Sequence, residues 1–173
     1  MNDLKLLVHV ILEEYALPSH GTHGVGHWAR VFENGLRLAA GTDANVAIVQ
    51  LFAVIHDARR ISEGVDDGHG RRGAELAAEL RGSLFDLSDD DFELLQFACA
   101  HHTDGLTEGD ITIQVCWDAD RLDLGRVGIV PAPKKLCTAA AKTWEIIKWA
   151  DGRAAFEVVP ELVKVEWRIK LEK

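Results

Sequence analysis

The chain has 173 residues, of which 47% are hydrophobic, and its formal net charge is −9 at pH 7. This length and apolar content are sufficient for a core and exclude wholesale disorder, so we expect a single domain over residues 1–173. The acidic balance argues against general nucleic-acid binding, which needs a basic face. Local arginines and a metal could still bind a small phosphorylated molecule.

The cysteines and the N-terminus indicate a cytoplasmic protein. Cys99, Cys116 and Cys137 are odd in number and show no CxxC spacing, which favours reduced thiols. The first two lie in apolar runs and are expected to be buried. The N-terminal MNDLKLLVHVILEEY is too short and too charged for a signal peptide or a membrane span, so we expect no membrane association.

Hydrophobic spacing predicts an all-α protein, a bundle of six or seven helices. The expected helices, in chain order, cover about 2–16, about 25–40, a segment ending at His56 and Asp57, about 70–81, Ser88 to His102, a segment after Asp110, and 134–150. Thr42 or Asp43 is expected to cap the third helix, Ser88 the fifth and Asp110 the sixth. The polar, glycine-rich stretch 59–70 is expected to form a loop.

The C-terminal tail allows two structures. Apolar residues alternate with charged ones from Val163 to Leu171, which is the period of a β-strand. A lone strand needs a partner, either residues 154–159 or the tail of a second subunit in a homodimer. A helix from Glu161 onward is the alternative, so the tail is expected as a short strand, a helix or an extended segment.

The third helix ends in two polar side chains that are costly to bury. Residues 46–55 leave no wide polar face, which indicates a helix buried nearly all round. His56 and Asp57 follow at its end, and a buried imidazole and carboxylate need a partner or an ion. Further ligand candidates are His23 and His27, four residues apart, and the acidic cluster Asp118, Asp120 and Asp123. Two imidazoles with two carboxylates suit divalent Mn, Mg, Fe, Co, Ni or Zn.

These segments resemble the HD-domain metal-dependent phosphohydrolases in HWARV at 27–31, HDARR at 56–60 and DADRLD at 118–123. The resemblance covers about residues 20–130, leaving 131–173 as an extension. It implies an HD-domain helical bundle in which His27, His56, Asp57 and Asp120 bind a divalent metal ion. His69 in HGRRGA and the pair His101–His102 resemble positions that bind a second metal or face the substrate phosphate.

The resemblance also suggests roles in hydrolysis by metal-activated water. Asp57 is expected to orient the attacking water, and His101 or His102 to protonate the leaving oxygen. Arginines near the site are expected to neutralise charge on the phosphoryl group, and the candidates are Arg59, Arg60, Arg30 and Arg121. His23 is a further candidate for substrate or metal, Asp118 for holding a ligand or an arginine, and Asp123 for a salt bridge.

The sequence thus predicts hydrolysis of a phosphoester or phosphoanhydride of a small metabolite, plausibly a nucleotide. Two alternatives stay open. One is a non-catalytic ligand-binding or regulatory module in which the metal only stabilises the structure. The other is an HD-type di-iron oxygenase, in which His69 and His101 would help to hold two irons.

Overall fold

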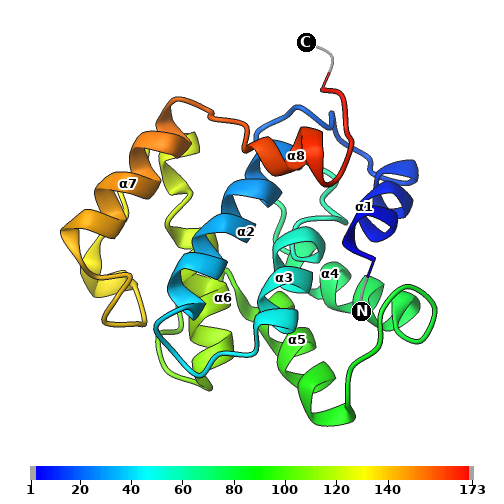
Figure 1. The fold of residues 1–173 in the computed structure, drawn as a ribbon, viewed down its shortest axis with the longest axis horizontal. Helices are drawn as coiled ribbons and strands as arrows, with labels where there is room; N and C mark the ends of the chain where they lie inside the picture. Colours follow the sequence, from blue (N-terminus) through cyan, green and yellow to red (C-terminus); the bar gives the residue numbers. More distant parts are fainter. Residues whose placement is uncertain (1–2, 172–173) are drawn as a thin grey trace.

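The computed structural model describes residues 3–171 and is built of helices (Figure 1). Its α-helices are α1 (Leu4–Glu13), α2 (Val25–Ala39), α3 (Val46–Ile55), α4 (His69–Leu80), α5 (Asp89–His101), α6 (Ile111–Arg121), α7 (Trp144–Ala155) and α8 (Glu161–Val165), with 3₁₀ turns at Leu124–Val127 and Pro133–Lys135. No strand is found between residues 3 and 171, so the all-α prediction is confirmed. Residue 2, the expected first residue of α1, lies outside this range.

Helix α3 is the centre of the fold, and α2, α4, α5 and α6 pack around it. Its residues from Leu51 to Ile55 are completely buried, as the continuous apolar run predicts. Helix α2 crosses α3 at Gly35, where a Cβ would lie 2.4 Å from Val49 Cγ1. The missing side chain therefore permits the close approach that carries the residues of α2 to the end of α3.

Side-chain caps fix where three helices begin. Ser88 and Asp110 accept hydrogen bonds from the backbone N–H groups of Asp91 and Thr112 at the start of α5 and α6, as expected. The predicted cap of α3 at Thr42 or Asp43 is wrong. Asn45 caps that helix by accepting a hydrogen bond from Ala47 N at 3.0 Å, whereas the Thr42 hydroxyl accepts from Ala44 N, before the helix begins.

The helix expected over 134–150 is wrong in its first half, since α7 begins only at Trp144. The buried carboxylate of Asp118 accepts hydrogen bonds from the backbone N–H groups of Cys137 and Thr138, both at 2.7 Å. These bonds hold residues 136–138 as a loop against α6. Trp144, the first residue of α7, is 67% exposed.

The tail forms helix α8 and an extended segment, so the strand interpretation is wrong. Val163 and Trp167 are both buried, whereas Val165 between them is exposed. Their spacing of four residues fits one face of a helix as well as alternate positions of a strand. The Trp167 ring packs edge-on against Phe32 of α2, with ring centroids 5.9 Å apart, so the tail is held by α2 instead of by a strand partner.

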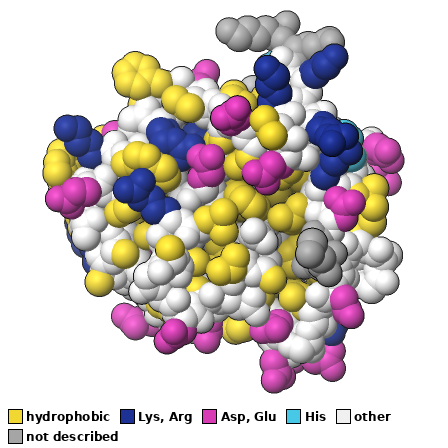
Figure 2. All heavy atoms as spheres, viewed as in Figure 1, with side chains coloured by type: hydrophobic (Ala, Val, Ile, Leu, Met, Phe, Trp, Pro, Cys, Tyr) yellow, Lys and Arg dark blue, Asp and Glu magenta, His cyan; other side chains and the backbone are white. Residues whose placement is uncertain are grey.

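The surface carries mixed charge. Figure 2 shows acidic and basic side chains interspersed around a hollowed, mainly hydrophobic area in the middle of one face. Among the described residues, no helix has both the length and the apolar character needed to cross a bilayer. Cys99 and Cys116 are buried, as expected, and Cys137 is half-buried; none of the three forms a disulfide.

Candidate metal centre

Three helices bring the predicted ligands together at one buried point. His27 lies in the first turn of α2, His56 and Asp57 follow the last turn of α3, and Asp120 lies in the last turn of α6. The Nε2 atoms of His27 and His56 are 3.1 Å apart. His27 Nε2 lies 3.5 Å from Asp57 Oδ2 and from Asp120 Oδ1, and His56 Nε2 lies 3.8 and 3.7 Å from the same oxygens.

These separations fit one divalent ion. Ligand atoms about 2.0–2.2 Å from a common ion lie roughly 3–3.5 Å from one another, close to the distances that join the two imidazoles to each other and to each carboxylate. Asp120 Oδ1 is buried and has no hydrogen-bond partner. A buried carboxylate oxygen without a partner is costly, and a cation among these donors would satisfy it. The residues present therefore fit a divalent metal.

Hydrogen bonds orient both imidazoles for binding. His27 Nδ1–H donates to Asp123 Oδ2 at 2.7 Å, and His56 Nδ1–H donates to the Phe52 carbonyl at 3.0 Å. Both Nε2 lone pairs are then directed at the cluster, as in metal centres where a carboxylate or carbonyl fixes the tautomer. Asp123 is held in turn by Arg30, whose Nε lies 2.6 Å from Oδ1. Asp123 thus forms the salt bridge that the sequence predicts, and it also orients the candidate ligand His27.

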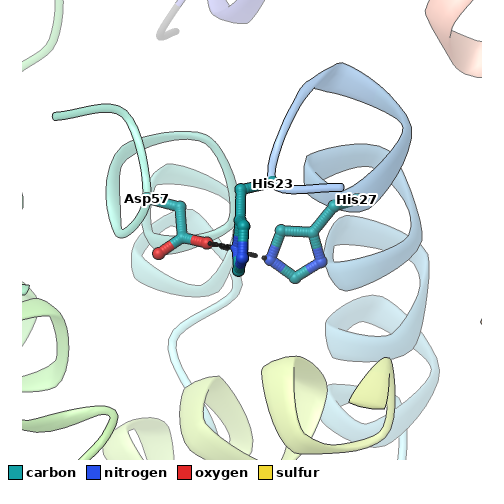
Figure 3. A group of neighbouring side chains, drawn as sticks. All are labelled: His23, His27 and Asp57. Carbon is teal, nitrogen blue, oxygen red and sulfur yellow. Dashed lines mark hydrogen bonds and ion pairs between the residues drawn. The ribbon is translucent and has the colours of Figure 1, made fainter. Parts of the chain in front are cut away.

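Three further imidazoles lie close to the carboxylate of Asp57. His23, from the loop before α2, donates from Nδ1 to Asp57 Oδ2 at 2.8 Å; Figure 3 shows His23 and His27 beside the Asp57 carboxylate. His69 Nε2 and His102 Nε2 lie 3.3 and 3.6 Å from Asp57 Oδ1. Gly70 makes this possible, because a Cβ there would lie 2.6 Å from the Cys99 carbonyl of α5.

Burial and charge set the protonation of the cluster. Burial lowers the pKa of His56 to about 3, despite the attraction of Asp57 and Asp120, so this ring is neutral and free to ligate at pH 7. Burial opposes ionisation of Asp120, but its interactions with His56 and Arg126 outweigh this effect and lower its pKa to about 2. For His102, burial is outweighed by the Asp57 carboxylate, whose Oδ1 lies 3.6 Å from Nε2, and by the negative charge of Asp120, so its pKa is raised.

Two predicted site residues lie away from the cluster. Arg59 forms ion pairs with Glu14 and Glu79, with Nη2–Oε2 distances of 2.8 and 3.3 Å, and does not reach the site. His101 points outward, 40% exposed in its side chain, and its Nδ1 lies 2.7 Å from Asp104 Oδ2. Of the adjacent pair, therefore, His102 is the histidine that faces Asp57, because residues 101 and 102 point in different directions from the end of α5.

Asp118 and Arg121, two further candidates, make contacts with the 135–138 segment. Asp118 holds backbone N–H groups of the 136–138 loop instead of a ligand or an arginine. Arg121 donates to the Lys135 carbonyl at 3.0 Å. Sequence reasoning missed Arg126, whose Nη2 lies 3.8 Å from Asp120 Oδ1. Its position three residues after Asp123, on the short 3₁₀ turn that follows α6, is the signal that could have found it.

Two cavities adjoin the cluster. One, of about 410 Å³, is reached by His102 and Asp120 and is otherwise mainly apolar, with Ile129, Val130 and Pro131 among its walls and Arg121 and Lys135 as its cations. The other, of about 780 Å³, is lined by His27, Arg30, Arg126 and residues of the C-terminal tail. Asp120, with 12% of its side chain exposed, is the most accessible of the four ligands, whereas His27 and His56 have none exposed.

Fold and cluster together define an all-α protein with a buried His–His–Asp–Asp centre suited to a divalent metal. The fold is similar to the crystal structure of a predicted HD superfamily hydrolase from an uncultured Thermotogales bacterium, with a TM-score of 0.61 and 28% identity over 92% of this chain and 87% of that chain. Comparisons with protein-family models and with curated proteins give no match. The predicted resemblance to the HD superfamily is thus confirmed in the fold and in a His/Asp cluster typical of an HD metal site.

Proposed function

We propose that the protein is a metal-dependent phosphohydrolase that cleaves a phosphoester or phosphoanhydride of a small metabolite, with a nucleotide as the first candidate. The observation that carries this proposal is the convergence of His27, His56, Asp57 and Asp120 with one accessible edge, at Asp120. The similarity to a predicted HD superfamily hydrolase supports hydrolysis as the reaction class.

A bound divalent ion supplies a Lewis acid that makes water a better nucleophile at neutral pH and withdraws charge from a phosphoryl oxygen. The protein supplies the positions of the groups around it. His27 and His56 present their Nε2 lone pairs because Asp123 and the Phe52 carbonyl fix their tautomers. Asp57 and Asp120 stay ionised, since the pKa of each carboxyl is lowered, and so each offers an anionic oxygen.

His102 is suited to protonate the leaving oxygen. It lines the 410 Å³ cavity, and its raised pKa keeps a proton on the ring in a pH range where an unperturbed histidine loses it. Arg121 and Lys135, in the wall of this cavity, and Arg126, beside Asp120 in the wall of the larger cavity, are the cations placed to neutralise a phosphoryl group. The expected phosphate contacts of Arg59 are replaced in this proposal by these residues.

The cavity also supports the substrate class. The phosphoryl group would lie at the polar end, where His102 and Asp120 meet, and the apolar walls would contact the rest of the molecule. A base or another flat, partly apolar group suits such walls better than a chain of phosphates. We infer a cytoplasmic protein because its three unpaired cysteines suit a reducing compartment.

The test compares Asp57→Ala with the wild type. Asp67→Ala is the matched control, an exposed aspartate in the loop before α4. Purified proteins are loaded with Mn²⁺, measured for bound metal by elemental analysis, and assayed on p-nitrophenyl phosphate and a panel of nucleotides. We expect Asp57→Ala to lose bound metal and hydrolysis together, and Asp67→Ala to keep both.

The same experiment separates the alternatives. Bound metal without turnover on any phosphoester, combined with a stability that depends on the metal, would support a non-catalytic module. The same proteins loaded with Fe²⁺ test the oxygenase, which would be supported by oxygen consumption with two irons per chain. Hydrolysis that survives both chelation and Asp57→Ala would overturn the proposed mechanism.

A further inference from the structure

A second group of donors lies next to the first and shares Asp57. His69 Nε2 and His102 Nε2 are 2.9 Å apart, and both face Asp57 Oδ1. Each ring donates its Nδ1–H to a backbone carbonyl, His69 to Asp66 and His102 to Cys99. Asp57 Oδ1 is buried and makes no hydrogen bond. This arrangement has the chemistry of a second cation site.

The guanidinium of Arg60 already lies at that position. Arg60 Nη1 donates to His69 Nε2 at 3.1 Å and lies 3.6 Å from Asp57 Oδ1. The residue is only 6% exposed, so its charge is directed into the cluster and not toward solvent. An arginine side chain is charged at every physiological pH. Its permanent positive charge therefore faces the carboxylate oxygen and the histidine nitrogen that a second ion would need.

The loop after α3 holds Arg60 in place. Arg60 Nε donates to the Ser62 carbonyl at 3.2 Å, and Nη2 donates to the Gly64 carbonyl at 2.7 Å. The loop itself is fixed by the Asp66 carboxylate, which accepts from Ile61 N at 2.9 Å and pairs with Arg72 at 2.6 Å. The guanidinium is thus bound on all three nitrogens and is not a mobile surface charge.

We propose that Arg60 acts as the built-in cation of this second position, so that the protein binds one divalent ion per chain. A second dication on Asp57 Oδ1 would have to break the Arg60–His69 hydrogen bond and lie beside a fixed positive charge, which repels it. Arg60 is then a positioning residue: it balances the charge of Asp57 and orients His69. An oxygenase that needs two irons on Asp57 is disfavoured by the same contact.

This inference rests on the metal centre of the proposed function but not on the hydrolysis. The test counts Mn²⁺ ions bound per chain by equilibrium dialysis with elemental analysis. The variant is Arg60→Met, which keeps much of the side-chain length and removes the charge. The matched control is Arg59→Met, because Arg59 is the adjacent arginine and pairs outside the cluster with Glu14 and Glu79.

We expect one Mn²⁺ per chain for the wild type and for Arg59→Met, and two for Arg60→Met. The added ion should be lost again in Arg60→Met combined with His69→Ala, because that histidine is one of the freed ligands. Circular dichroism checks that the variants are folded. If Arg60→Met does not fold, His69→Ala alone decides: it should leave the count at one, whereas in a two-ion protein it lowers the count.

Two ions on the wild type, or one ion on folded Arg60→Met, would overturn the proposal. Its failure is distinguishable from failure of the proposed function. One bound ion with no hydrolysis of any phosphoester leaves Arg60 as the second cation and removes the enzymatic assignment. Two bound ions with hydrolysis would overturn the role of Arg60 and support the enzymatic assignment.

Discussion

His27 Nδ1 lies 2.7 Å from Asp123 Oδ2, so a ligand on α2 is oriented by a carboxylate that follows α6, 96 residues later in the chain. Asp123 is itself almost completely buried and is paired with Arg30, one turn beyond His27 on α2. The burial of three polar groups in a row is stable because each of them is hydrogen-bonded. The candidate metal centre therefore depends on residues outside the proposed ligand set.

Asp123→Asn tests this dependence. The substitution keeps the shape of the side chain but removes its charge, which weakens both the His27 and the Arg30 contacts. We expect the affinity for Mn²⁺, measured by isothermal titration calorimetry, to fall about 10–100-fold, as is usual for such supporting carboxylates. Asp67→Asn serves as the control, and an unchanged affinity in Asp123→Asn would show that the Asp123–His27 contact does not orient the ligand.

Removal of the metal should lower stability, because the ion binds only the folded cluster. At a free metal concentration about 100-fold above Kd, binding contributes about 2.7 kcal/mol. For a chain of 173 residues this corresponds to a decrease in Tm of roughly 5–10 °C after chelation. Differential scanning fluorimetry with and without a chelator measures it. Asp57→Ala should show almost no response to the chelator, and a similar shift in that variant would place the ion elsewhere.

Acid should destabilise the metal-free protein below about pH 6.5. The pKa of His56 is 6.5 when unperturbed and about 3 in the folded protein, so the unfolded chain binds the proton more readily. Stability is then complete above pH 6.5 and falls as the pH decreases toward 3, by about 1–2 kcal/mol for His56 between pH 6.5 and 5. The pKa of His69 is also lowered, mainly by burial, which acts in the same direction.

His102 acts in the opposite direction, but over a higher pH range. Because its pKa is raised in the folded protein, its contribution is complete below pH 6.5 and is lost only at higher pH. Urea unfolding of the chelated protein at pH 7 and pH 5 measures the effect. His56→Gln should reduce the difference between the two pH values, and equal stability of the wild type at both would contradict the role of His56.

A methyl group added at Gly73 should displace His56 and so disturb the candidate metal centre. A Cβ at this position of α4 would lie 2.8 Å from the His56 carbonyl and 3.0 Å from the Ile55 carbonyl, both backbone atoms. Because backbone cannot easily move away, we expect Gly73→Ala to lower the free energy of unfolding by about 1–3 kcal/mol and to weaken Mn²⁺ binding through the displaced His56.

Gly152→Ala is the matched control for this substitution. Gly152 lies in α7, and nothing is within 4 Å of the position where its Cβ would be. Alanine should therefore stabilise the helix there by up to about 1 kcal/mol. Thermal unfolding of both variants measures the contrast, and a neutral Gly73→Ala would show that α4 and the end of α3 are less closely packed than these distances indicate.

The sequence by itself determined the helical class and named four candidate ligands that the fold brings close together. The apolar run before His56 could only be a buried element, and a buried His–Asp pair requires a partner or an ion. Ser88 and Asp110 marked their helix starts because capping is a local interaction within a few residues. The same local reasoning failed at 134–143 and in the tail, where Asp118 and Phe32, distant in sequence, decide the conformation.

Only the tertiary structure decided which candidates serve the centre. Arg59 and Arg60 are adjacent and chemically identical, yet one pairs with Glu14 at the surface and the other reaches His69. Likewise, His101 pairs with Asp104 at the surface, whereas His102 faces Asp57. A sequence specifies which groups are available, but the direction of a side chain at the end of a helix is set by the packing of other helices, here α4 against α3 and α5. That packing places an arginine where a second ion could otherwise bind.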